Sequence, residues 1–147
     1  MSHLAGGAGA GVEPWTVIPG DAHRVIAIVC GGAVGALART LLVDQVNVAA
    51  GGWPWPTFIA NVAGALLLGY LATRLQERLP PSTYRRPFAA TGLCGALTTF
   101  STFQVELIRI VRAGHPLLAA AYGCASLAAG FVALTAATLV VRRARLA

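Results

Sequence analysis

From Pro87 to Val105 the chain reads PFAATGLCGALTTFSTFQV, a stretch without a single charged residue. Such a stretch is long enough to cross a bilayer, which takes about 20 apolar residues. Its middle differs from an ordinary span, because Gly92, Gly95 and a run of hydroxyl residues interrupt the apolar pattern and make a poor uniform helix. The stretch therefore predicts a membrane-spanning helix over about 87–108 that is broken in mid-membrane.

Three further apolar runs, at about 25–43, 57–74 and 116–141, are also long enough to span a bilayer. The composition agrees with four spans, since 56% of the 147 residues are hydrophobic and only 11% are charged. An ordinary soluble domain is about a quarter charged. The sequence thus predicts an all-α membrane protein, with a four-span domain over 23–147 after a flexible, glycine-rich tail over 1–22.

Several function classes are excluded or disfavoured by composition. The chain has no lysine, which excludes lysine Schiff bases and phosphate-loop chemistry. Cys30, Cys94 and Cys124 lie far apart in apolar runs, and no nucleophile and base pair or metal-ligand cluster is evident, so we do not expect an enzyme. Despite the net charge of +6, we expect no nucleic-acid binding, because most of the surface should face lipid.

Small residues recur at helix-packing distance, for example Gly31 with Gly35 and Ala60 with Gly64. Such spacing brings backbones together within a protomer or between subunits, and the pattern does not distinguish the two.

Polar residues inside the spans are candidate sites, since they are costly there. Arg39 lies near a span end, where it either snorkels to the headgroups or serves a pore mouth. The Asn61 amide either donates to an anion or ties two helices together.

The broken third span offers groups for ions of both signs. Backbone carbonyls near Gly95 and Thr98 lose helical partners at a break and could coordinate a hard monovalent cation. Phe100 and Phe103 share one helical face, and their electropositive ring edges either attract a small anion or pack in the core. The hydroxyl residues of this segment either bond to their own backbone or line the same path; they are Thr98, Thr99, Ser101 and Thr102.

In the last span, Tyr122, Ser126 and Gly130 recur every four residues and form one narrow stripe. This stripe is either a hydrogen-bonded helix contact or a polar track for a permeant ion.

Three motifs, GGAVGALAR at 31–39, TFIANVAGALLLG at 57–69 and above all GLCGALTTFSTF at 92–103, resemble the CrcB/Fluc fluoride channel family. The resemblance implies a passive fluoride exporter built as an antiparallel dimer of four-span subunits, with two pores and a structural sodium ion at the dimer centre. It also implies that Gly95 and Thr98 give carbonyls to the sodium ion. The fluoride path implied by the matching positions contains Arg39, Asn61, Thr99, Phe100, Thr102, Phe103, Tyr122 and Ser126.

Two other functions remain open at this point. A small proton-coupled multidrug transporter also has four spans, but it needs a carboxylate embedded in the membrane. The acidic residues here fall in the tail or at span ends, and Glu106 is the nearest candidate. A non-transporting scaffold explains the small-residue packing, but not a break followed by two phenylalanines.

All eleven basic residues are arginines, and their distribution predicts the topology. Eight lie on the side of the N-terminus, the second loop and the C-terminus, whereas the opposite side has only Arg109 and Arg112. The positive-inside rule then places both termini in the cytoplasm, with the protein in the inner (plasma) membrane. Because so strong a bias orients the subunit one way, we expect its antiparallel partner to be an oppositely oriented homologue.

Overall fold

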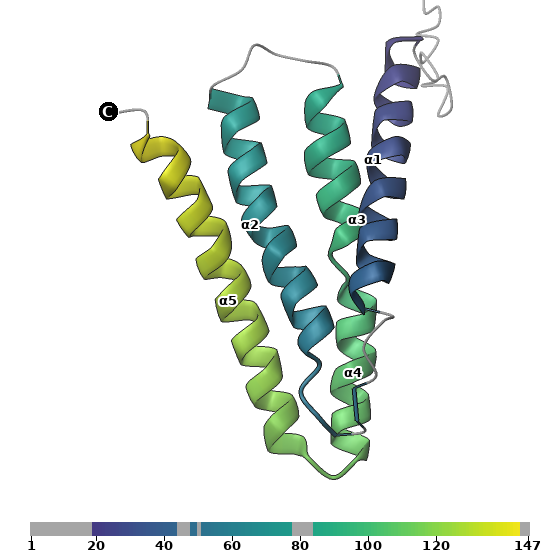
Figure 1. Ribbon diagram of the computed structural model, residues 1–147, viewed down its shortest axis with the longest axis vertical. Helices are drawn as coiled ribbons and strands as arrows, with labels where there is room; N and C mark the ends of the chain where they lie inside the picture. Colours follow the sequence, from purple (N-terminus) through teal and green to yellow (C-terminus); the bar gives the residue numbers. More distant parts are fainter. Residues whose placement is uncertain (1–18, 44–47, 50, 78–83, 145–147) are drawn as a thin grey trace, which may run out of the picture.

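The computed structural model describes residues 19–43, 48–49, 51–77 and 84–144. In these ranges every regular element is a helix, and Figure 1 shows their order along the chain. The elements are α1 (Pro19–Val43), α2 (Trp55–Glu77), the π-helix η1 (Pro87–Cys94), the short α3 (Gly95–Leu97), α4 (Phe100–Arg112) and α5 (Pro116–Arg143). Residues 19–22, expected in the tail, form the first turn of α1, and residues 1–18 lie outside the described ranges.

Three helices in the described part of the chain are long and apolar enough to cross a membrane, namely Ala22–Val43, Trp55–Leu75 and Pro116–Arg143. The remaining segment, expected as a single span over 87–108, is divided into η1, α3 and α4 and continues to Arg112. The structure is therefore all-helical, with about four helical segments.

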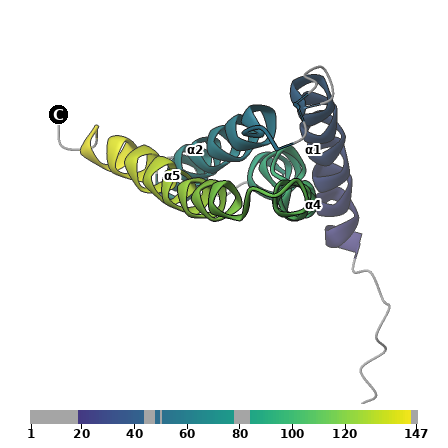
Figure 2. The ribbon, with the colours of Figure 1, turned by 90° about the horizontal axis from the view of Figure 1, so that it is seen from below.

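The helices pack mainly as two pairs, α2 with α5 and α1 with η1 and α3 (Figures 1 and 2). Glycine makes the second contact possible. A Cβ atom at Gly31 would overlap the Phe88 carbonyl oxygen, and one at Gly35 would overlap that of Leu93. The GGAVG glycines thus pack helices within one protomer, which answers the alternative that the sequence left open for this pair.

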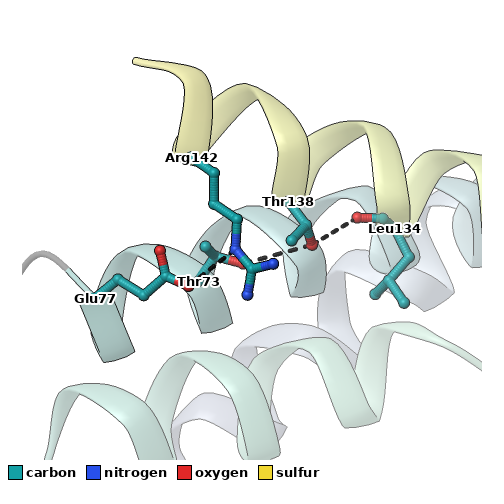
Figure 3. Close-up of polar contacts among 5 residues, drawn as sticks. All are labelled: Thr73, Glu77, Leu134, Thr138 and Arg142. Atoms are coloured by element: carbon teal, nitrogen blue, oxygen red, sulfur yellow. Dashed lines mark hydrogen bonds and ion pairs between the residues drawn. The ribbon is translucent and has the colours of Figure 1, made fainter. Parts of the chain in front are cut away.

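Polar contacts link α2 and α5 near the C-terminal ends of both helices (Figure 3). The Thr73 hydroxyl donates to Thr138 Oγ1 at 3.4 Å, and Thr138 Oγ1 donates to the Leu134 carbonyl at 2.9 Å. Beyond them, Arg142 Nε lies 3.0 Å from Glu77 Oε1. The arginine side chain is 60% exposed, so this ion pair contributes little energy.

Candidate functional site

Two residues with extended backbone, Thr98 and Thr99, separate α3 from α4. Their dihedral angles are φ −79°, ψ 150° and φ −141°, ψ 118°. The Thr99 side chain caps α4, because its Oγ1 accepts the Thr102 N–H at 3.2 Å and donates to Thr102 Oγ1 at 3.0 Å. Thr99 is only 5% exposed, so both hydroxyls serve the local structure.

Asn61, on α2, satisfies the backbone of this interruption from the side. Its Oδ1 accepts the Thr99 N–H at 2.8 Å, and its Nδ2 donates to the Thr99 carbonyl at 3.2 Å. The sequence left two roles open for this amide, donation to an anion and a link between helices. The structure shows the link, between α2 and the interruption. One of the two amide hydrogens on Nδ2 is left over for another acceptor.

These side-chain bonds divert two backbone donors. In a continuous helix the Thr99 N–H would donate to the Gly95 carbonyl and the Thr102 N–H to the Thr98 carbonyl. Here they donate to Asn61 Oδ1 and to Thr99 Oγ1. The carbonyls of Gly95 and Thr98, which the sequence nominated as cation ligands, are thus among those that lose their helical partners at the interruption.

Gly95 and Thr98 also line a hollow of about 290 Å³ between α2, η1 and α5. The wall is mostly apolar and is partly open to the surface of the chain. Phe131, one of its wall residues, is 69% exposed. The other lining residues are Gly64, Ala65, Leu68, Ala90, Cys94, Gly130 and Leu134.

The two phenylalanines after the interruption differ in their surroundings. Their ring centroids are 6.1 Å apart in a stacked arrangement, but Phe103 is 8% exposed and Phe100 is 69% exposed. Phe103 also packs on Tyr122 of α5, with 5.2 Å between centroids. Of these two rings, Phe103 is enclosed within the chain and Phe100 is mostly uncovered.

Glu106 belongs to this site, although the sequence indicated it only as a carboxylate at a span end. It lies six residues before the end of α4, and its carboxylate accepts the Tyr122 hydroxyl at 2.8 Å and the Thr57 hydroxyl at 2.5 Å. Its position three residues after Phe103, on the buried face of an amphipathic helix, was the available signal. Because the Tyr122 hydrogen is used on Glu106, the hydroxyl of Tyr122 is not a free donor.

Ser126 follows Tyr122 by one turn of α5. Its Oγ atom is buried beside the Tyr122 hydroxyl but forms no well-aligned hydrogen bond in the described part of the chain. Trp53 Nε1 is the other buried side-chain atom without a partner there. Arg39 is partly buried on α1 and makes no hydrogen bond or ion pair with the described residues, so it is not drawn into this cluster. The fold thus gathers four of the predicted site residues around the interruption, namely Asn61, Phe103, Tyr122 and Ser126. Arg39 lies outside this group.

Long apolar helices and an interrupted segment with buried polar groups define a small multi-pass membrane protein. Residues 26–138 match the family described as CrcB-like protein, Camphor Resistance (CrcB), and the chain belongs to this family.

Curated relatives carry a more specific name. "Fluoride-specific ion channel FluC 1" of Mycobacterium tuberculosis is 53% identical over 126 residues, which cover 86% of this chain and 96% of the relative. The FluC 1 protein of Mycolicibacterium paratuberculosis is 50% identical over 125 residues (85% and 95%). "Fluoride-specific ion channel FluC 2" of Streptomyces avermitilis is 38% identical over 108 residues (74% and 68%). These names give no support to a multidrug transporter.

Proposed function

We propose that this chain is a subunit of a fluoride-selective channel, through which fluoride leaves the cytoplasm passively and its toxicity is reduced. The observation that carries the proposal is the 53% identity to a fluoride-specific ion channel over 96% of that protein's length. The family match, over residues 26–138, includes the whole interrupted segment and the groups around it.

The fluoride path runs along α2, α4 and α5 past the interruption. Fluoride is a small hydrogen-bond acceptor, so a path must replace its water with close donors. Asn61 keeps one amide hydrogen, and the buried Ser126 hydroxyl has no acceptor among the described residues. The Phe103 edge adds an electropositive wall. Thr99 and Thr102 contribute by holding the interruption open, and Tyr122 by its ring, whereas the role of Arg39 at a pore mouth rests on the resemblance alone.

A structural sodium ion fits the carbonyls of Gly95 and Thr98. Both oxygens have lost their helical donors, and carbonyl oxygens are suitable ligands for a hard cation. Gly95 has open space around its Cα, with no neighbouring atom within 4 Å of the point that a Cβ atom would occupy, so a partner can approach it closely. A cation there would also neutralise the negative end of the η1–α3 segment. In such a site sodium supplies charge, and the chain supplies the oxygens.

The surface that a single chain leaves uncovered supports our proposal of an antiparallel dimer. Phe100 and Phe131 are each 69% exposed, and the hollow that holds Gly95 and Thr98 is open. A second subunit seated on this face would cover the phenyl rings and bring a second set of carbonyls to the cation. With the strong arginine bias, we place both termini in the cytoplasm, and we propose that the partner is a homologue of opposite orientation.

Fluoride flux from liposomes tests the function. Vesicles loaded with potassium fluoride and carrying this chain with its partner should release fluoride to an ion-selective electrode, and vesicles loaded with chloride should retain it. Phe100→Ile and Asn61→Asp should each abolish release. Undiminished flux in both variants would remove the assigned path, and equal chloride release would remove the selectivity.

The same assay tests the assembly. The chain expressed alone is expected to give little flux, and co-expression with a homologue of the opposite charge bias should restore it. Robust flux from the chain alone would show that a homodimer suffices.

A further inference from the structure

We propose that the indole N–H of Trp53 is a hydrogen-bond donor to the permeating anion at the end of the path near the start of α2. The proposal rests on the proposed channel function and adds to it a residue that determines anion affinity. Trp53 Nε1 is buried and has no hydrogen-bond partner in the described part of the chain. A buried hydrogen-bond donor without an acceptor is costly. We therefore infer that the acceptor of this indole N–H is a species that binds transiently.

The position of Trp53 fits this role. Its ring meets the Tyr122 ring edge to face, with 5.3 Å between centroids and an interplanar angle of 80°. Trp53 comes from the segment that precedes α2, whereas Ser126 follows Tyr122 one turn further along α5. The two described buried donors that lack partners thus flank the same tyrosine.

Tyr122 does not offer its hydroxyl hydrogen to a permeating anion. Its hydroxyl donates to Glu106 at 2.8 Å, so the hydroxyl hydrogen is not available to an anion. The Tyr122 ring packs in a T shape on the indole, and any N–H contact with a ring is weak compared with a bond to an anion. Trp53 therefore supplies the donor that Tyr122 cannot.

Trp53 is also held rigidly, which lowers the entropic cost of binding. Its ring packs on Phe58 and Trp55, with centroid distances of 5.8 and 5.7 Å. Pro54, which is buried, fixes the backbone directly after it, and the Trp55 N–H donates to the Trp53 carbonyl at 2.9 Å. The donor is thus in place before the anion arrives.

Trp53→Phe is the direct test, because phenylalanine keeps an aromatic ring and removes the N–H. Trp55→Phe is the matched control: Trp55 belongs to the same aromatic cluster but is 58% exposed. At fluoride concentrations below saturation, we expect Trp53→Phe to lower flux about tenfold, as for loss of one hydrogen bond to a charged group. Trp55→Phe should stay within about twofold of the parent, as for a surface substitution.

Fluorescence gives a second readout that keeps Trp53 in place. In a Trp15→Phe, Trp55→Phe background, Trp53 is the only tryptophan. Its emission should change with added fluoride, saturate in the range where flux saturates, and not respond to gluconate at the same ionic strength. This measurement needs no Trp53 variant, so it stands even where Trp53→Phe does not fold.

The outcomes separate the two proposals. Flux in the parent together with an unchanged concentration dependence in Trp53→Phe overturns the role of Trp53 and leaves the channel function intact. Equal losses in Trp53→Phe and Trp55→Phe, or emission that is insensitive to fluoride, overturn it as well, since they indicate packing alone. Absence of flux in the parent with its partner counts against the channel function itself.

Discussion

Replacing Asn61 by alanine removes the two bonds that satisfy the backbone of the interruption. The carboxamide accepts the Thr99 N–H at 2.8 Å and donates to the Thr99 carbonyl at 3.2 Å. Alanine provides neither group, and Thr99 is 5% exposed, so water does not reach it readily. The expected result is a segment that leaves its extended conformation or takes up water in place of the carboxamide.

The size of the effect follows from the two groups. Each buried backbone group left unpaired costs about 1–3 kcal/mol, so the parent geometry should lose about 2–6 kcal/mol. Each 1.4 kcal/mol is about tenfold in an equilibrium constant. Where conduction needs this geometry, fluoride flux in Asn61→Ala should fall at least about tenfold, and the midpoint of thermal unfolding in detergent should fall with it.

Thr135→Ala is a matched control for this prediction. The Thr135 hydroxyl donates only to carbonyls of its own helix, those of Phe131 at 2.9 Å and Val132 at 3.1 Å, so its loss frees no buried partner. The control should keep the flux and thermal midpoint of the parent. Flux and thermal stability in Asn61→Ala that match those of Thr135→Ala would refute the idea that Asn61 maintains the interruption.

Three further predictions concern the surrounding contacts. Tyr122→Phe removes one of the two described hydroxyl donors to Glu106, worth about 1.5–3 kcal/mol for a charged acceptor, and should lower the thermal midpoint and the flux. Gly35→Ala should reduce the yield of monodisperse protein in gel filtration, because its Cβ overlaps the η1 backbone, whereas Gly32→Ala, with open space around it, should not. Glu77→Gln should change neither property, since an exposed ion pair is worth about 0–1 kcal/mol; a large drop in thermal midpoint would contradict this.

Much of the helical layout was predictable because lipid imposes simple rules. Apolar length identified the three long helices, and the start of α5 at Pro116 agrees with the tolerance of proline in a first turn. The start of α1 at Pro19 was not predictable, because the turn before Ala22 has no apolar signature. The cluster at 92–103 indicated where the third segment departs from a uniform helix, and the structure places the extended residues at Thr98 and Thr99.

The partners of the site residues were not predictable, since they depend on which helices meet. The sequence presented Asn61 as either an anion donor or a helix tie, and only its distance to Thr99 distinguishes the two. Glu106 looked peripheral because of the arginines that follow it, yet its carboxylate faces α2 and α5. The spacing of Phe100 and Phe103 was read correctly as one helical face, but spacing does not say that one ring is buried and the other exposed.

A single local arrangement links the two ion sites that we propose. The Thr99 N–H donates to Asn61 and the Thr99 side chain accepts the N–H of Thr102, and these two bonds fix the start of α4, which carries Phe103. The same two bonds take the helical donors away from the carbonyls of Gly95 and Thr98. A cation at those carbonyls would therefore stabilise the conformation that the anion path requires, because a continuous helix would abolish both sites together.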